Sequence, residues 1–477
     1  MAGITYLEIK TNWKEIQEIE ELNIMQEINE HGRLELTGVL VEQNKDSLVT
    51  QSLEGKEIEV YAEQDTQIVL FKGLIQEAAI HMTGGLYTIR ILGITYSILT
   101  DTKKKNRSFQ DIGMTYTSLV NQMIKDYDKG VIKDLASGGK AIETLLVQYQ
   151  ETDWEFFKRL ASHFNMGILP SLILEGPKIM FGTYEGKDWG NIDCHEYTLS
   201  KNLLDYKQVS ENTFPALTEQ DVVEYEIDVL DCFEIGEKVT YQGKSYRIKR
   251  KQAVLVQDML RFRYVLSSQR GLGKERIYAS QLKGVSLKGT VIKSVQDKVK
   301  VHLEIDPEQA ESTAFLFPYT TVYTAEGQSG WYCMPEAGDT VLIYFPSGEE
   351  GQAVGMNSYR TGEKGTAQIT DPKTKYFRTA DGKELKFSPE EIVITCIQGK
   401  DPKTGENKTI YIKLNQTTGI EIKSTLPVQI TSNEGVSITA EEKVEITASE
   451  SISLRCKKSQ IKMDSKVDIC GPEVRIN

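Results

Sequence analysis

The sequence contains few of the residues on which enzyme chemistry most often depends. Only five of its 477 residues are histidines: His31, His81, His163, His195 and His302. None of them belongs to an HExxH motif or to a pair of metal ligands at helical spacing. Cys194 and His195 are adjacent, and adjacent residues of a strand point to opposite faces. We therefore expect scattered surface histidines, with no catalytic, metal-binding or cofactor-binding residues.

Cysteine and positive charge are also scarce. The six cysteines lie far apart without a CxxC spacing, which argues against a disulfide scaffold and favours free thiols: Cys194, Cys232, Cys333, Cys396, Cys456 and Cys470. Lysine and arginine number 56 against 69 aspartates and glutamates, and the net charge of −13 argues against nucleic-acid binding. Long apolar runs are missing as well, so we expect no membrane span and no signal peptide. The chain should be made in the cytoplasm.

The strongest pattern is a repeat of eight residues between about residues 410 and 477. Pairs of apolar residues separated by one polar residue recur at this spacing: Ile412 and Leu414, Ile420 and Ile422, Val428 and Ile430, Val436 and Ile438, Val444 and Ile446, Ile452 and Leu454. The rhythm loosens afterwards but continues to Val474 and Ile476. Residues i and i+2 lie on the same side of a strand, so each pair predicts a very short strand with one apolar face.

An octad is too short to enclose a core of its own, so its apolar residues form a ridge along the chain. Burying one aliphatic side chain is worth roughly 1.5–3 kcal/mol, which strongly favours covering the ridge. Three copies wound about one axis would give each ridge a closed interior. We predict a triple-stranded β-helix with this core: Ile420, Ile422, Val428, Ile430, Val436, Ile438, Val444, Ile446, Ile452 and Leu454. The alternatives are an antiparallel meander and a single-chain solenoid.

The rest of the chain alternates between strand patterns and one helical segment. Residues 1 to about 100 read as strands, with a glycine turn at Gly84 and Gly85. A first helix is expected from about Met114 to Tyr127. A second one starts with a capping box of Thr152 and Glu155 and has one apolar face: Phe156, Phe157, Leu160, Ala161 and Phe164. Strands then resume and end near residue 270.

Residues 282–360 read as a separate all-β module. A hairpin is predicted over 287–303, and Pro335, Gly338 and Asp339 form a turn before a buried strand. Residues 361–409 are polar and rich in turns. The acidic pairs Glu349–Glu350, Glu390–Glu391 and Glu441–Glu442 lie in turns, and we expect them to be solvated rather than arranged as glycosidase carboxylates.

Three segments resemble the valine-glycine repeat (VgrG) and phage tail-spike proteins of contractile injection systems. They are the octads, the D-W-E-F-F-K-R-L-A helix at 153–161, and the P-E-A-G-D-T-V-L-I-Y-F segment at 335–345. The resemblance implies a mainly β fold with a small α insertion, divided as follows: a two-barrel hub over 1–275 with a helical insertion at about 106–170, an OB-fold domain over 282–360, a collar and hairpin linker over 361–409, and a β-helical needle over 410–477.

The resemblance also implies a function, that of a non-enzymatic structural spike. Such a homotrimer caps a hexameric inner tube, contacts baseplate proteins, carries effector cargo, and is ejected to puncture a target envelope in a type VI secretion-like system or phage tail. A PAAR-type tip would sit on a platform made by the last residues: Val474, Arg475, Ile476 and Asn477. We therefore expect no enzyme fused within residues 361–409 or after residue 477.

Two other functions are weighed against the spike. An OB fold can bind oligonucleotides, but basic residues beside Tyr319, Tyr323 and Trp331 are sparse, so no nucleic-acid binding is expected. The alternative from another class is a tail-associated cell-wall or polysaccharide hydrolase on a trimeric β-helix. It requires carboxylates clustered in a groove, a pattern that the sequence does not display.

Overall fold

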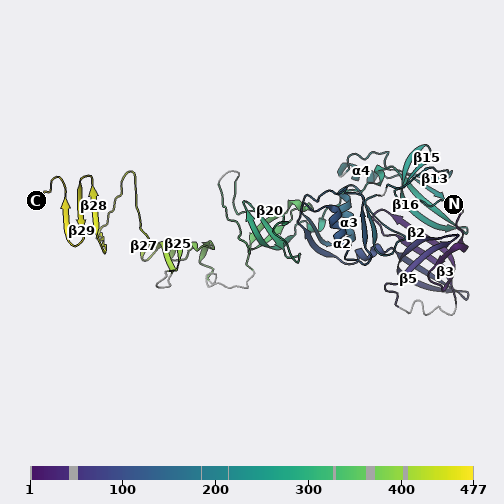
Figure 1. Ribbon diagram of the computed structural model, residues 1–477, viewed down its shortest axis with the longest axis horizontal. Helices are drawn as coiled ribbons and strands as arrows, with labels where there is room; N and C mark the ends of the chain where they lie inside the picture. The colour runs from purple at the N-terminus through teal and green to yellow at the C-terminus, as the bar shows by residue number, and fades with distance from the viewer. Residues whose placement is uncertain are drawn as a thin grey trace. The chain divides into compact units, whose positions relative to one another are not determined.

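The computed structural model describes residues 3–41, 52–183, 185–212, 214–325, 329–360, 371–400 and 407–475. Two compact units divide the chain, residues 1–361 and residues 362–477 (Figure 1). Strands dominate both units, and every α-helix of the described residues lies in the first unit. The predicted fold class, mainly β with a few helices, is therefore confirmed.

A twelve-stranded sheet forms the N-terminal part of the first unit. Ten strands follow one antiparallel path: β1 (Ile9–Thr11), β4 (Glu57–Glu63), β5 (Gln67–Thr83), β6 (Leu86–Ile94), β3 (Arg33–Leu40), β2 (Ile16–Glu27), β16 (Lys244–Val256), β17 (Met259–Ser267), β14 (Val223–Val229) and β13 (Tyr197–Lys201). β15 (Lys238–Tyr241) joins β16 and also pairs with β12 (Asp188–Asn191). The pairing of β2 with β16 connects strands distant in sequence. The division of this sheet into two closed barrels stays a prediction.

Strict alternation of apolar residues explains why these segments are strands. In β3, every second residue from Leu34 to Leu40 is buried, while the residues that alternate with them are only half-buried. The β5–β6 hairpin turns at Gly84 and Gly85, which have φ angles of 61° and 89°. Side chains with a Cβ rarely adopt such angles, so two glycines suit this tight turn. The glycine turn predicted from the sequence is confirmed.

The segment predicted as a helical insertion contains both predicted helices. α2 (Tyr116–Ile124) and α3 (Asp153–Ser162) pack together in one apolar cluster. Thr152 Oγ1 accepts from the backbone N–H of Glu155 at 3.1 Å, and the Glu155 carboxylate accepts from the N–H of Thr152 at 2.9 Å, as the capping box predicted. Short strands frame the helices: β7 (Lys105–Phe109), β8 (Val131–Asp134), β9 (Leu146–Glu151), β10 (Ile168–Pro170) and β11 (Lys178–Phe181).

One α-helix was not predicted. α4 (Leu203–Asn212) has no fully buried residue in its described part, and its apolar residues do not form a clear stripe. A helix without a buried face lacks the periodicity from which helices are recognised. Short 3₁₀ turns complete the unit: η1 (Tyr6–Glu8), η3 (Tyr96–Asp101), η4 (Arg270–Leu272), η5 (Ser280–Leu282) and η6 (Glu350–Gln352).

A five-stranded antiparallel sheet closes the first unit. Its order is β20 (Leu316–Pro318), β19 (Lys298–Leu303), β18 (Ser286–Val295), β21 (Thr340–Tyr344) and β22 (Val354–Ser358). β18 and β19 form the predicted hairpin. Before β21, the Asp339 carboxylate accepts from the N–H of Glu336 at 2.8 Å, and Gly338 has a φ of 93°, which bears out the predicted turn. The assignment of this sheet to an OB fold stays a prediction.

The helical insertion is fastened to this sheet by contacts across a long stretch of sequence. The Asp306 carboxylate accepts from the backbone N–H and the hydroxyl of Ser108, at 2.7 and 2.5 Å. Gln110 Nε2 donates to the carbonyl of Val301 at 3.2 Å. Leu145 and Val147 belong to the apolar cluster of the five-stranded sheet, so β9 contributes to two cores.

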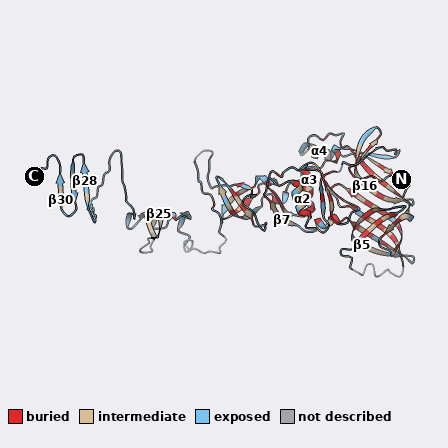
Figure 2. Cartoon of the chain, in the orientation of Figure 1, coloured by how far each residue is buried: buried red, intermediate tan, exposed pale blue. Residues whose placement is uncertain are grey.

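The described residues of the second unit form no buried hydrophobic core. A five-stranded meander comes first: β23 (Lys375–Arg378), β24 (Lys383–Phe387), β25 (Glu391–Lys400), β26 (Asn407–Asn415) and β27 (Gly419–Lys423). A three-stranded meander follows: β28 (Ile452–Cys456), β29 (Ser459–Met463) and β30 (Val467–Cys470). Among the described residues after 371, no hydrophobic side chain is buried, whereas buried residues fill the strands of the first unit (Figure 2).

Candidate assembly surface

The period of eight is present in the backbone as well as in the sequence. After β27 the chain is extended and bends at regular intervals, at residues 425–426, 433–434, 441–442 and 449–450, and the β28–β29 turn follows at 457–458. Ser424 and Ser432, eight residues apart, accept hydrogen bonds from backbone N–H groups at two of these bends, at 3.1–3.2 Å. Each octad is thus one extended segment and one bend.

The apolar pairs of the octads form an exposed ridge along this segment. Of the ten residues predicted as the needle core, nine are between 54% and 75% exposed and Ile452 is half-buried. Soluble chains rarely leave so many aliphatic side chains together in water. We call these ten residues the octad ridge. The structure of the single chain leaves it uncovered, so its role as a trimer core remains a proposal.

The backbone of the octads between β27 and β28 also lacks partners among the described residues. Residues 424–451 pair with no strand in the described part of the chain, and no backbone–backbone hydrogen bond reaches them from any described residue. An extended chain with free N–H and C=O groups is a template for pairing with another extended chain. The octads therefore offer both an apolar ridge and two open hydrogen-bonding edges.

The last octads pair within the chain. In β28 and β29, Ile452 faces Met463 and Leu454 faces Ile461, and β29 continues to β30 with Ile461 opposite Ile469. The antiparallel meander considered from the sequence therefore occurs over residues 452–470, though not over 424–451. Of the predicted tip platform, Val474 and Arg475 are exposed, and Ile476 and Asn477 lie outside the described residues.

The described residues contain no group of three or more histidine, cysteine or acidic side chains that could hold a metal ion. No helix among them is long and apolar enough to span a bilayer. Cys194 and His195 line an open pocket of about 870 Å³. Cys194 Sγ donates to the carbonyl of Glu196 at 3.1 Å, while the His195 side chain is 92% exposed. No dyad is formed there.

Solved structures of known proteins share this architecture. A component of the type VI secretion system of E. coli, c3393, described as similar to the T4 bacteriophage tail proteins gp27 and gp5, is 12% identical with a TM-score of 0.52. The match covers 74% of this chain and 99% of that one. A chain of the lidded PdpA–VgrG complex of Francisella is 10% identical with a TM-score of 0.53, covering 87% of this chain and 79% of that one.

The chain has the fold of the VgrG and phage tail-spike proteins. The resemblance expected from three short segments is therefore confirmed at the level of the fold. No protein-family model matches the sequence, and no curated protein matches it significantly. The shared VgrG fold is thus visible in the arrangement of strands, while the sequences have diverged to about a tenth of identical positions.

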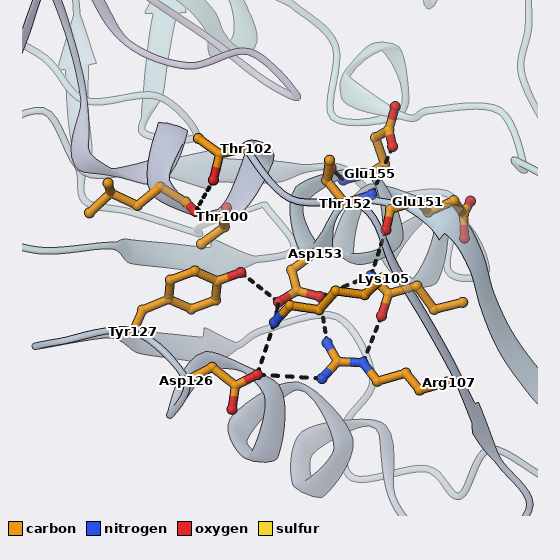
Figure 3. A network of polar contacts seen from close by, with 12 residues as sticks. Thr100, Thr102, Lys105, Arg107, Asp126, Tyr127, Glu151, Thr152, Asp153 and Glu155 are labelled. Carbon is orange, nitrogen blue, oxygen red and sulfur yellow. Dashed lines mark hydrogen bonds and ion pairs between the residues drawn. The ribbon is translucent and has the colours of Figure 1, made fainter. Parts of the chain in front are cut away.

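The D-W-E-F helix of this VgrG-like chain is held by a buried charge network that the sequence did not reveal (Figure 3). Asp153, fully buried at the start of α3, accepts hydrogen bonds from Lys105 at 2.7 Å and Tyr127 at 2.6 Å, and it pairs with Arg107. Burial alone would raise the pKa of Asp153, but hydrogen bonds from Lys105 and Tyr127 and the charge of Arg107 lower it overall. Both oxygens of the Asp153 carboxylate thus have hydrogen-bond partners, which indicates a structural role for the network.

A second group of buried charges joins α3 to η6, which lies between two strands of the five-stranded sheet. The guanidinium of Arg159 is 1% exposed and contacts the carboxylates of Glu151, at 2.7 Å, and Glu350. It also donates to the carbonyl of Val147 at 2.8 Å. The expectation that Glu350 is solvated is therefore wrong. Glu350 follows β21 in the chain, and only folding brings it to a helix that lies far earlier in the sequence.

Two histidines also differ from the expected surface position. His31 is stacked on Trp154 at 4.1 Å between ring centres and is hydrogen-bonded to Ser97 at 2.7 Å. His163, at the end of α3, is hydrogen-bonded to the hydroxyl of Tyr116 at 2.8 Å. Each imidazole thus contacts an aromatic ring and is hydrogen-bonded to a hydroxyl group.

The lowered pKa of His163 leads us to expect that the folded chain loses stability in acid. Burial, with Arg276 and Arg159 nearby, lowers the pKa of His163 to about 3, against about 6.5 in the unfolded chain. The unfolded state therefore binds the proton first, so this contribution is complete above pH 6.5 and is lost as the pH falls toward 3. Between pH 7 and 5 the expected loss is about 2 kcal/mol.

Urea titrations of the full chain between pH 7.5 and 5 measure this loss. His163→Gln should flatten the dependence of unfolding free energy on pH. His195→Gln, which changes an exposed histidine, should leave the dependence as in the wild type. An unchanged slope in His163→Gln would show that another group controls stability in this range.

Proposed function

We propose that this chain is a structural spike protein of a contractile injection system or phage tail and that it works as a homotrimer. The observation that carries the proposal is the octad ridge, an exposed apolar surface with a fixed period, whose backbone over residues 424–451 pairs with no described strand. A segment that packs on this surface must have apolar residues at the same eight-residue spacing and must also provide extended strands. A second and a third copy of the same segment meet both requirements.

The energy available from covering the ridge supports this proposal. Nine side chains of the ridge are more than half exposed, and burying each completely contributes roughly 1.5–3 kcal/mol. These side chains are already partly covered in the single chain. Covering the part that is still exposed would therefore contribute on the order of 10 kcal/mol per chain. New backbone hydrogen bonds between chains would add to it. Three chains around one axis enclose each ridge and leave no free strand edge.

The likeness of the fold supports a position for such a trimer at the end of an inner tube. The VgrG and phage tail-spike likeness favours a hub made by the N-terminal sheet, which would rest on a hexameric inner tube and contact baseplate proteins. The octads would form the needle that is ejected with effector cargo and enters the target envelope. An intertwined assembly without free edges unfolds slowly, which suits a part that is driven through a membrane or wall. No step of this role requires an active site.

The solution mass of the purified full-length chain tests the proposal. Light scattering should give about three times the chain mass of 53.8 kDa, and the assembly should resist mild SDS. A shortened chain that ends at residue 405, without the octads, should dissociate more readily. A full-length monomer would mean that the ridge is covered within one chain, and the spike proposal would lose its physical basis. Turnover of cell-wall material by the pure protein would favour the hydrolase instead.

The end of the described chain is proposed as a platform for a PAAR-type tip. Val474 is 49% exposed, and Arg475 is held by Glu473 at 2.7 Å, so both side chains are accessible in the single chain. Deleting residues 470–477 should abolish co-purification of a tip protein while the trimer mass is retained. Undiminished co-purification after this deletion would place the tip elsewhere.

A further inference from the structure

The most exposed aromatic side chains of the described residues are gathered in one short segment of the first unit, between β20 and β21. They are Tyr332, Trp331 and Tyr323, which are 75%, 59% and 56% exposed. The other tryptophans of the chain are at most 37% exposed. We call the described residues 319–325 and 329–334 the aromatic hairpin. So much aromatic surface in so few residues indicates a contact site.

Backbone hydrogen bonds bring Tyr323 and Trp331 together on one side of the aromatic hairpin. The two strands meet at an antiparallel bridge between Thr324 and Gly330. Beside it, the N–H of Trp331 donates to the carbonyl of Tyr323 at 2.8 Å. Residues that lie directly opposite in antiparallel strands point to the same side, so the two rings are neighbours. Gly330 has a φ of 134°, and a Cβ there would lie 2.8 Å from the Cα of Thr324, so this close approach requires glycine.

The base of the aromatic hairpin is fixed to the five-stranded sheet at both ends. At its start, the N–H of Thr320 donates to the carbonyl of Gly355 in β22 at 2.8 Å. At its end, the hydroxyl of Tyr332 donates to the carbonyl of Gln296, in the turn between β18 and β19, at 2.9 Å. Aromatic rings that are already held in place lose little freedom when a ligand binds, which favours affinity.

The charge of this segment limits the class of ligand. Residues 319–339 include three acidic residues and no lysine or arginine. Nucleic acids and anionic lipids are bound largely through lysine and arginine, so the composition argues against both. A sugar ring has an apolar face of C–H groups and a rim of hydroxyls, and tyrosine and tryptophan offer an apolar face with a polar edge. An uncharged carbohydrate therefore matches this surface.

The residues between the aromatic rings favour a carbohydrate over a second copy of the chain. Hydroxyl groups surround the rings, from Thr320, Thr321, Thr324 and Ser329, while Val322 is the only branched aliphatic residue of the aromatic hairpin. The octad ridge, which we assign to contact between copies, is aliphatic at every position. Rings that alternate with hydrogen-bonding groups suit a ligand that is itself apolar on its faces and polar at its rim.

We propose that the aromatic hairpin binds an uncharged oligosaccharide, whose sugar rings stack on Trp331 and Tyr323 while their hydroxyls bond to the polar groups beside them. The two aromatic rings stand on an exposed hairpin, so the site suits several linked, flat sugars rather than one enclosed sugar. Binding itself does not depend on the trimer. The inference rests on the proposed spike function only for the source of the sugar, which would be a glycan of the target envelope.

Calorimetric titration of the full-length chain with cellohexaose and with chitohexaose tests the proposal. Both are flat, uncharged, β-linked chains of six sugars, and chitohexaose carries in addition the acetamido groups found in cell-wall glycans. Saturable binding of either one is the expected result. Binding of chitohexaose alone would point to a cell-wall glycan as the source. Absence of saturable binding for both sugars would overturn the inference.

Substitutions in the same chain locate the site. Trp331→Ala and Tyr323→Ala should each weaken sugar binding by about tenfold or more, since aromatic residues at the centre of a contact carry much of its affinity. Trp331→Phe keeps a ring and should weaken it less. Tyr197→Ala, which removes a tyrosine that is 49% exposed on β13, is the matched control and should leave binding unchanged. Unchanged binding in Trp331→Ala would place the sugar elsewhere and contradict the proposal.

Light scattering of the same samples separates this inference from the proposed function. A monomeric chain that binds the sugar through Trp331 would retain this inference while the spike proposal fails. A trimer that binds neither sugar would give the reverse result. If Trp331→Ala instead lowered the guanidinium concentration at which such a trimer dissociates, copies of the chain would cover the aromatic hairpin, and the sugar site would be ruled out.

Discussion

A full-length chain that carries Val436→Asp together with Ile438→Asp is expected to lose its trimer. The two residues form one apolar pair of the octad ridge, 59% and 73% exposed in the single chain. In the proposed assembly they face the same pair of two other copies. A buried charge without a partner costs about 3–5 kcal/mol, and three copies meet at one level. The combined penalty exceeds the gain from several intact pairs.

Ser437→Asp together with Thr439→Asp is the matched control. These residues alternate with the ridge residues, so their side chains point away from it, and the trimer should survive. Light scattering and SDS gels of both variants provide the measurement. A stable trimer in the ridge variant would show that this pair lies on the outside of the assembly, which contradicts the predicted core.

Arg159→Leu is expected to destabilise the first unit by about 3–5 kcal/mol. The substitution removes the guanidinium between Glu151 and Glu350 and leaves two carboxylates in a buried site. Burial is the main reason that the pKa of Glu151 is raised, and Arg159 opposes this effect. Without Arg159 the carboxyl of Glu151 should take up a proton more readily, so the destabilisation should be smaller near pH 5 than near pH 7.

Urea unfolding of the full chain, followed by the fluorescence of buried Trp154, measures the effect. Lys158→Leu is the matched control, since it changes a cation of the same helix that is not buried and should alter stability by less than about 0.5 kcal/mol. If Arg159→Leu behaved like this control, the bridge between α3 and η6 would not contribute to stability.

Local features of the chain were predictable because they depend on neighbours in sequence. The Thr152–Glu155 capping box, the glycine turn before β6 and the Asp339 turn each lie within a few residues. Their hydrogen bonds form wherever the local backbone allows them. The octad spacing is also local, and the bends at every eighth residue follow it.

Features that join distant segments were missed. Glu350 was expected in water, yet it neutralises Arg159, and His163 was expected at the surface, yet it lies against Tyr116. α4 was missed for the opposite reason, since it has no buried face to give it a periodic pattern. Burial of a single polar residue leaves no signal in the sequence, because it depends on which segments meet.

The sequence by itself determined the repeat, the mainly β class and the likeness to the VgrG and tail-spike proteins, because periodicity and turn chemistry are properties of consecutive residues. Only the tertiary structure decided that β2 pairs with β16, that a charge network holds the D-W-E-F helix, and that Glu350 meets Arg159. These depend on strand register and on contacts between segments that are far apart, and register is fixed only when the strands meet.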